Sequence, residues 1–187
     1  MKIEETTLPG VLLVAPDVFG DHRGYFQESW NKRKFAELGL NLDFVQDNLS
    51  YSKKGILRGL HFQNPQPQGK LVQALQGEVF DVAVDIRKGS PNFGHWFGTV
   101  LSAENHRNMY VPEGFAHGFC VLSEHALFSY KCTEFYNPKT EFALRYDDPD
   151  IGIPWPLDGE PSLSPKDINA LLLKDFPQDL LPVYETP

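Results

Sequence analysis

The sequence is poor in cysteine, with only two among its 187 residues. Both of them, Cys120 and Cys132, lie inside apolar, strand-like runs. A secreted disulfide framework or a metal-binding knuckle would need more cysteines at closer spacing. We therefore expect two reduced, buried thiols, and we assign a catalytic role to neither.

A long apolar run is also missing. No stretch approaches the roughly 20 residues that a membrane-spanning helix requires. The start of the chain, Met1 to Glu5, carries acidic residues where a secretory signal would be apolar. Together these two absences predict a cytoplasmic protein without a membrane partner.

Positive charge is scarce as well. The chain has 17 Lys and Arg against 25 Asp and Glu, a formal net charge of -8, and its pI is about 5.2. Nucleic acids and acidic membranes bind basic patches, so this balance argues against both as partners. An anionic ligand would have to be bound by a local group of cations. With 41% hydrophobic residues, the chain is long enough for one core and short for two, which predicts a single domain over residues 1–187.

Helical periodicity is limited to two short segments. One helix is expected over residues 32–38, capped by Asn31. Another is expected from Pro165 to about Lys174, with Ser164 as its cap and Asp167 completing a capping box. The Pro- and Gly-rich residues 147–161 are expected to wrap the surface as ordered coil.

Short strand patterns fill most of the remaining chain. They are expected at residues 11–14, 25–30, 44–50, 56–62, 70–76, 79–86, 96–101, 109–111, 118–122, 126–132 and 142–146, with a turn-rich segment at 16–24. Helices that could build parallel crossovers are missing between them. The pattern therefore predicts an all-β fold, an antiparallel sandwich or barrel.

The stretch from Ile56 to Leu71 carries the strongest chemical signal. Alternation along its first half places His61 near the end of a strand, and a loop with two prolines and a glycine follows. Lys70 opens the next apolar run. An imidazole and an ammonium therefore come from the ends of two successive strands, a pair that can support proton transfer.

A second motif, residues 112–117, has the Pro-x-Gly-x-x-His spacing of the second cupin motif, which brings a histidine into the mouth of a β-barrel. A metal-binding cupin would add two more histidines and a glutamate from an earlier hairpin. Here the matching stretch offers His61 and Gln63, and then Lys70, which would repel a divalent cation. Because His61 and His117 alone are too few ligands, we expect no metal and no other cofactor.

A series of further motifs runs along the chain. They are Arg23-Gly24-x-Phe26-x-Glu28, Gln46-Asp47-Asn48, Arg58-Gly59-Leu60-His61, Gly69-Lys70-Leu71-Val72, Val82-Ala83-Val84-Asp85-Ile86-Arg87, residues 112–119, Tyr130-Lys131-Cys132, Asp148-Pro149-Asp150 with Trp155-Pro156, and Ser164-x-Lys166-Asp167. In this order they resemble, over nearly the whole chain, the dTDP-4-dehydrorhamnose 3,5-epimerases. These are cupin-like, metal-free enzymes that act on a nucleotide-linked 4-keto-6-deoxy sugar.

The resemblance implies a cupin-like jelly roll, a homodimer by strand exchange near the N-terminus, and the conversion of dTDP-4-dehydro-6-deoxy-D-glucose to dTDP-4-dehydro-L-rhamnose. Inverting a carbon beside a ketone requires a base, an acid on the opposite face and a group that stabilises the enolate. By resemblance, His61 is the base and Asp167 holds its tautomer. Lys70 then stabilises the enolate oxygen, and Tyr130 is the acid.

The resemblance also implies a set of substrate-binding positions. Arg23 and Arg58 would bind the diphosphate, because guanidinium groups match phosphate oxygens. Phe19 and Phe26 would stack on thymine. The other positions of this set are Glu28, Gln46, Asp47, Asn48, His117, Glu141 and Lys166.

Ordinary structural roles remain open for several of these residues. Asp167 occupies the position where a capping box after Ser164 would place a carboxylate, although we favour its pairing with His61. His117 is either a structural histidine or a neighbour of the sugar. Tyr130 could be a core tyrosine with a bonded hydroxyl, the phenylalanines could belong to the core, and the cations could be solvated.

Three other functions stay open. An epimerase that inverts only C3 or only C5 would use the same base and acid, so product stereochemistry separates it from the main hypothesis. A non-catalytic jelly roll that binds sugar nucleotides would not need His61, Lys70 and Tyr130 together, and solvent hydrogen exchange would identify it. A metal-dependent cupin oxygenase is disfavoured by the missing ligands.

Overall fold

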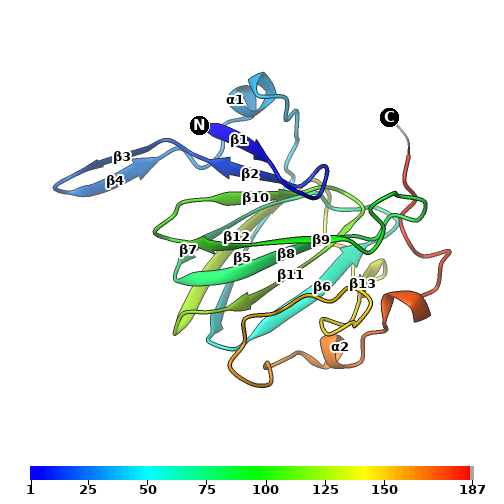
Figure 1. Cartoon of the computed structure of the whole chain (residues 1–187). Coiled ribbons are helices and arrows are strands. Elements are labelled where there is room, and N and C mark those ends of the chain that lie inside the picture. Colours follow the sequence, from blue (N-terminus) through cyan, green and yellow to red (C-terminus); the bar gives the residue numbers. More distant parts are fainter. Residues whose placement is uncertain (186–187) are drawn as a thin grey trace.

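The computed structural model describes residues 1–185 and contains two antiparallel sheets that pack face to face (Figure 1). One sheet has the order β1 (Lys2–Glu5), β2 (Leu12–Ala15), β10 (Asn108–Val111), β7 (Lys70–Gln76), β12 (His125–Cys132) and β5 (Gln46–Lys53). The other has the order β13 (Glu141–Ala143), β6 (Leu57–Gln63), β11 (Phe115–Val121), β8 (Glu78–Asp85) and β9 (Trp96–Ser102). The predicted all-β antiparallel sandwich is confirmed.

The core between the sheets follows from the alternation of side chains along each strand. In β12, Ala126 and Phe128 point inward and pack with Val72 of β7 and with Phe119 of β11. The opposite side chains of β12, such as Leu127, are only partly buried. The inward row of each strand thus forms the core and also the walls of any pocket between the sheets.

The outer face of the five-stranded sheet is covered by the C-terminal coil. Ile151, Ile153 and Leu181 are buried there against Leu60 and Val84. This cover explains why all seven residues of β11 are buried, because the strand has apolar neighbours on both faces. The predicted wrapping coil at 147–161 is confirmed.

Both short helices are present, and one is shorter than expected. Helix α1 (Lys32–Glu37) is capped by Asn31, whose side chain accepts a hydrogen bond from the Lys34 amide. Helix α2 (Pro165–Ile168) is capped by Ser164. The expected extension to Lys174 is wrong, since the chain leaves the helix after α2. There Leu171 forms a bridge with Leu144, and the Leu173 amide donates to Asp148. A 3-10 turn, η1 (Leu173–Asp175), follows.

A hairpin of β3 (Val18–Asp21) and β4 (Gly24–Gln27) stands away from the body of the molecule (Figure 1). The strand expected at 25–30 is present but ends at Gln27, and the turn expected at 16–24 is wrong for residues 18–21, which form β3. The turn is confined to His22 and Arg23, where the Arg23 amide donates to Asp21 Oδ1 at 2.8 Å. Strand β1 was also missed.

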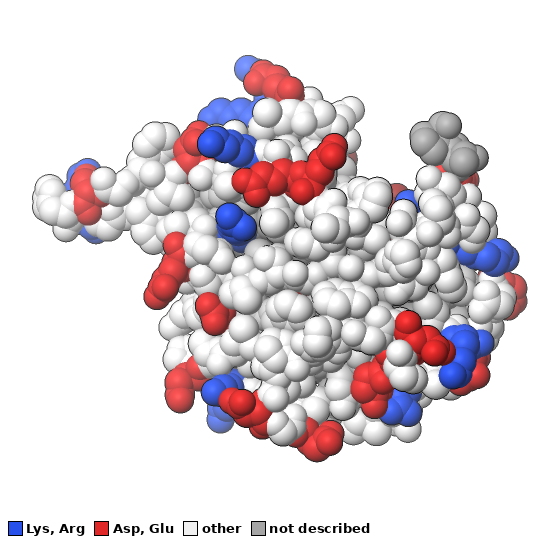
Figure 2. All heavy atoms as spheres, viewed as in Figure 1, with Lys and Arg blue, Asp and Glu red and all other residues white. Residues whose placement is uncertain are grey.

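The surface agrees with the acidic composition. Figure 2 shows Lys and Arg scattered singly or in small groups among Asp and Glu on one face of the molecule, without a continuous basic patch on that face. Cys120 and Cys132 are both free and buried, as predicted. Within residues 1–185, no helix has the length and apolar character needed to cross a membrane.

The contact between β6 and β11 leads to a first prediction. A Cβ at Gly59 (φ +127°) would lie 2.5 Å from the Gly118 Cα and 2.8 Å from the His117 carbonyl oxygen. Gly24 has nearly the same φ of +129° but open space around it. Both Gly→Ala variants should suffer backbone strain of roughly 1–3 kcal/mol, and Gly59→Ala should lose about 1–3 kcal/mol more from overpacking. Urea unfolding of the two variants measures this difference, and equal losses would contradict it.

Candidate active site

A pocket of about 270 Å³ lies between the two sheets. Its walls come from β5, β6, β7, β11, β12 and β13, together with the loop after β12 and helix α2. Seven of the predicted site residues line it, namely Arg58, His61, Lys70, His117, Tyr130, Glu141 and Lys166. Ser50, Phe119, Phe128 and Tyr136 complete the lining. The structure therefore brings the central part of the predicted site together.

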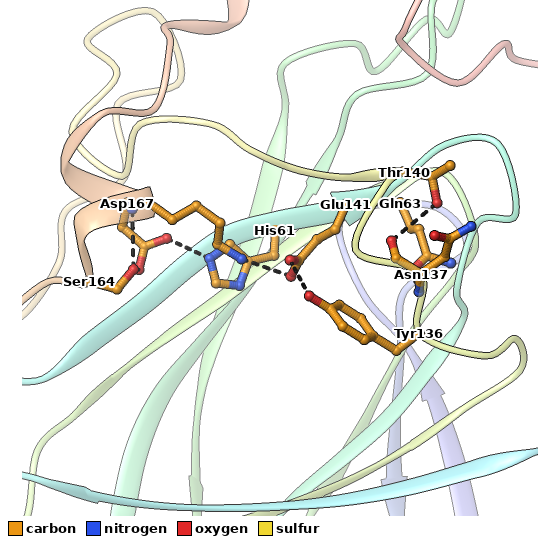
Figure 3. A network of polar contacts seen from close by, with 9 residues as sticks. His61, Gln63, Tyr136, Asn137, Thr140, Glu141, Ser164 and Asp167 are labelled. Carbon is orange, nitrogen blue, oxygen red and sulfur yellow. Dashed lines mark hydrogen bonds and ion pairs between the residues drawn. The ribbon is translucent and has the colours of Figure 1, made fainter.

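His61 and Asp167 form a hydrogen-bonded pair (Figure 3). The imidazole Nε2 lies 2.5 Å from Asp167 Oδ1. The other carboxylate oxygen, Oδ2, accepts from the Ser164 hydroxyl at 2.8 Å, and the same hydroxyl accepts from the Asp167 amide. One carboxylate oxygen thus pairs with His61, and the other holds the hydroxyl of Ser164, the residue that caps the helix.

The surroundings of this pair favour a neutral imidazole. Burial lowers the pKa of His61 below 6.5, against the raising effect of Asp167. Burial raises the pKa of Asp167, but hydrogen bonds from His61 and Ser164 hold it below its usual value. The ionised carboxylate accepts the Nε2 proton of the ring. This tautomer leaves Nδ1 as the basic nitrogen.

Lys70 and Tyr130 face His61 from the opposite sheet. Tyr130 pairs in register with Val72, and Cys132 pairs with Lys70, so both polar side chains lie on the inner face. Burial lowers the pKa of Lys70 and raises the pKa of Tyr130. Lys70 has no ion pair with any described residue. A phenol that stays protonated and a lysine amine without an ion pair among the described residues therefore lie across the pocket from the imidazole.

His117 belongs to a second pair. It is the cross-strand neighbour of His61, and its Nε2 lies 2.9 Å and 3.1 Å from the two oxygens of Asp81. Asp81 is fully buried, and burial raises its pKa against the opposing effect of His117. The sequence analysis missed Asp81. Alternation along β8 could have identified it, because Asp81 shares the inward face of this strand with the core residue Ala83.

The rim of the pocket carries the remaining charges. Lys166 pairs with Glu141 at 2.8 Å, and Glu141 also accepts from the Tyr136 hydroxyl at 3.0 Å (Figure 3). The Arg58 guanidinium donates to the Ser52 hydroxyl at 3.1 Å. With Lys70, this gives three cations around one pocket in a chain whose net charge is -8. An anionic ligand would find its local cations here.

The predicted run at residues 46–48 lies beside the pocket and is partly engaged by the protein itself. Gln46 donates to Asn48 at 3.0 Å and accepts from the Tyr136 amide at 2.8 Å. Asn48 contacts the Cys132 sulfur at 3.6 Å. Asp47 alternates to the outer face, where it pairs with Lys131 at 2.9 Å.

Four further predicted residues lie on or beside the protruding hairpin and do not line this pocket. Phe19, Arg23 and Phe26 lie on the protruding hairpin, where Arg23 pairs with Asp21 and the two rings are 65% and 68% exposed. Glu28 follows the hairpin and pairs with Lys34 at 2.9 Å.

Tyr136 is a pocket residue that the sequence analysis missed. Its ring is 51% exposed at the rim, between β12 and β13. The adjacent aromatic residues Phe135 and Tyr136 could have indicated a binding surface, because they lie in a polar loop outside the core. Ser50 was also missed; its hydroxyl is buried without a hydrogen-bond partner among the described residues. Within residues 1–185, no group of three or more His, Cys, Asp or Glu side chains is arranged to hold a metal ion.

Comparison with known proteins identifies a family of dTDP-sugar epimerases. A family model described as dTDP-4-dehydrorhamnose 3,5-epimerase matches residues 5–175. The protein of that name from Salmonella typhimurium is 56% identical, over 92% of this chain and 96% of its own. A dTDP-6-deoxy-D-glucose-3,5-epimerase from Legionella pneumophila, solved with dTDP-4-keto-L-rhamnose, superimposes with a TM-score of 0.97 and 52% identity over 99% of both chains. A dTDP-4-dehydrorhamnose 3-epimerase from Streptomyces niveus is 41% identical, over 100% of this chain and 91% of its own.

The His61–Asp167 pair leads to a second prediction. Because the carboxylate raises the pKa of His61 against burial, Asp167→Asn should lower that pKa further. An NMR titration of the imidazole in both proteins measures the change. Asp158→Asn is the control, since Asp158 is exposed and pairs only with Lys54, and it should leave the titration unchanged. A higher His61 pKa in Asp167→Asn would contradict the assignment.

Proposed function

Because the chain belongs to the dTDP-4-dehydrorhamnose 3,5-epimerase family, we propose that it inverts C3 and C5 of dTDP-4-dehydro-6-deoxy-D-glucose by proton transfer through an enolate. One observation carries this proposal. His61 with Asp167 faces Tyr130 and Lys70 across a single pocket, and the two groups come from opposing sheets. A planar enolate between them would have a base on one face and an acid on the other.

The pKa directions of His61 and Tyr130 support a neutral base and a protonated acid. The neutral His61 ring accepts the proton beside the ketone at Nδ1, and Asp167 stabilises the imidazolium that forms. The Lys70 ammonium stabilises the enolate oxygen in a site where burial strengthens electrostatic interactions. Tyr130 then delivers a proton to the opposite face, a step suited to a phenol whose pKa burial has raised.

Two cations and an aromatic ring at the rim match the diphosphate and the base of the proposed nucleotide ligand. Arg58 and Lys166 are placed to bind the diphosphate, because both are cations lining the pocket. Tyr136 presents the exposed aromatic ring of the lining, and its hydroxyl is fixed by Glu141. Such a ring can stack on the thymine base.

Inversion at only one carbon is the alternative that shares this site. Support for inversion at both comes from the greater identity to the 3,5-epimerase of Salmonella typhimurium, 56%, than to the 3-epimerase of Streptomyces niveus, 41%. Incubation with dTDP-4-keto-6-deoxyglucose, followed by NMR assignment of C3 and C5 in the product, tests the proposal. Retained configuration at either carbon would favour the alternative.

The protein is further proposed to be a homodimer. The outer face of the six-stranded sheet exposes Leu49, Tyr51 and Leu75 at 66%, 58% and 42%. Hairpin β3–β4 exposes the rings of Phe19 and Phe26. Apolar surface of this extent is expected to be covered by a partner. A second copy whose hairpin crosses over would also bring the predicted binding residues Arg23 and Phe26 to a pocket.

A third prediction separates the base from the acid. In D2O, His61→Asn should show neither epimerisation nor deuterium incorporation above background, because no group removes the proton. Tyr130→Phe should still form the enolate, so it should incorporate deuterium with retained configuration if the imidazolium exchanges with solvent. Its inverted product should fall by about 10²-fold, the value of a lost general acid.

NMR of the recovered sugar nucleotide measures both quantities in the same sample. The roles fail if Tyr130→Phe epimerises at the wild-type rate or if His61→Asn still exchanges its substrate rapidly.

A fourth prediction concerns the dimer. Light scattering at micromolar concentration should give twice the monomer mass of 21.2 kDa. If Arg23 acts in the partner's pocket, a mixture of His61→Asn and Arg23→Ala protomers should recover activity after subunit exchange. Each mixed dimer then has one pocket with both residues intact. A monomer mass, or a mixture no more active than its separate components, would refute this arrangement.

A further inference from the structure

We infer that Gln63 is a positioning residue for Tyr136, and that it holds the loop after β12 in the conformation that receives the nucleobase. This inference rests on the proposed function, in which Tyr136 contacts the thymine. Gln63 lies two residues after His61 on β6 and is 3% exposed. It does not line the pocket, so a direct role in the chemistry does not explain its burial.

The side-chain amide of Gln63 forms three hydrogen bonds, all to backbone atoms of the loops after β6 and β12. Its Nε2 donates to the carbonyls of Gln66 at 2.6 Å and Phe135 at 3.1 Å. Its Oε1 accepts from the backbone N–H of Asn137 at 2.9 Å. Two of these three partners flank Tyr136 directly in sequence. The side-chain amide therefore fixes the backbone on both sides of the tyrosine. Figure 3 shows Gln63 beside Asn137 and Tyr136.

Other contacts of the loop complete the orientation of the ring. The Tyr136 amide donates to Gln46, and its hydroxyl donates to Glu141. Asn137 in turn donates through its side chain to Gln66 at 2.9 Å and accepts from the Thr140 amide, at the turn that leads into β13. Gln63 is the buried member of this network and ties it to the strand that carries His61.

The physical benefit of the network is preorganisation. A half-exposed ring on a polar loop loses conformational freedom when a base stacks on it, and this loss weakens binding. Three hydrogen bonds from a rigid strand remove part of that freedom before the ligand arrives. A buried amide left without these partners would be destabilising, so the contacts and the burial depend on each other.

The consequence is a split between binding and chemistry. Gln63→Met keeps the side-chain length and removes all three hydrogen bonds. We expect its affinity for dTDP to weaken roughly two- to tenfold, the range for ordering one side chain, and its KM to rise accordingly. The kcat should stay near the wild-type value, because His61, Lys70 and Tyr130 are untouched. Binding of inorganic pyrophosphate should not change, since the hydrogen bonds of the Gln63 side chain do not involve Arg58 or Lys166, the proposed diphosphate ligands.

A double-mutant cycle measured by titration calorimetry with dTDP tests the assignment. The proteins are wild type, Gln63→Met, Tyr136→Ala and the double variant. If Gln63 acts through the ring, adding Gln63→Met to Tyr136→Ala should weaken dTDP binding no further. Gln76→Met is the control, because the Gln76 side chain hydrogen-bonds His125 at the far end of β7 and does not line the pocket, and its dTDP affinity should equal that of wild type.

Three results would overturn the inference: unchanged dTDP affinity in Gln63→Met, additive losses in the double variant, or an equal loss of pyrophosphate binding. If Gln63→Met does not fold, Gln63→Glu takes its place in the cycle, since it keeps only the acceptor for Asn137. Faster hydrogen exchange of the Asn137 amide should accompany either variant, and unchanged exchange would also overturn the inference. The wild-type turnover assay reports separately on the proposed function, because dTDP binding does not require epimerisation.

Discussion

The contact between His61 and Asp167 organises the site, because it joins a central strand to a helix 106 residues away in the sequence. The carboxylate can reach the imidazole only if α2 lies against β6. That position depends on the C-terminal coil, whose apolar residues Ile151 and Ile153 are buried on the outer face of the sheet. The same buried surface that stabilises the fold therefore also places the partner of the proposed base.

Burial between the sheets is also the leading influence on the titrating groups. It lowers the pKa of His61 and Lys70 and raises the pKa of Tyr130. These are the directions expected when a low-dielectric surrounding disfavours each charged form. Asp167 departs from this pattern because two hydrogen bonds keep it ionised. A neutral imidazole, a protonated phenol and a carboxylate therefore lie close together.

A polar network at the rim of the pocket connects the loop after β12 to the strand that carries His61. Gln63 and His61 share one strand, so the loop that carries Tyr136 and the base are fixed to the same rigid element. Glu141 connects this loop to helix α2, since it accepts from the Tyr136 hydroxyl and pairs with Lys166. The proposed nucleotide-binding residues and the proposed proton-transfer residues are thereby connected through the strand that carries Gln63 and His61.

The sequence by itself determined most of the strands and the inward position of most residues that line the pocket, because alternation assigns each side chain to a face without reference to other strands. Its motifs also named His61, Lys70, Tyr130 and Asp167. Only the tertiary structure decided that Asp167 contacts both His61 and the capping residue Ser164, since that depends on where its two carboxylate oxygens point. It also decided that Tyr136 lines the pocket while Phe19 and Phe26 project from a hairpin. These outcomes could not be predicted from the sequence, because loop and hairpin positions depend on contacts distant in the chain, such as those that Gln63 makes.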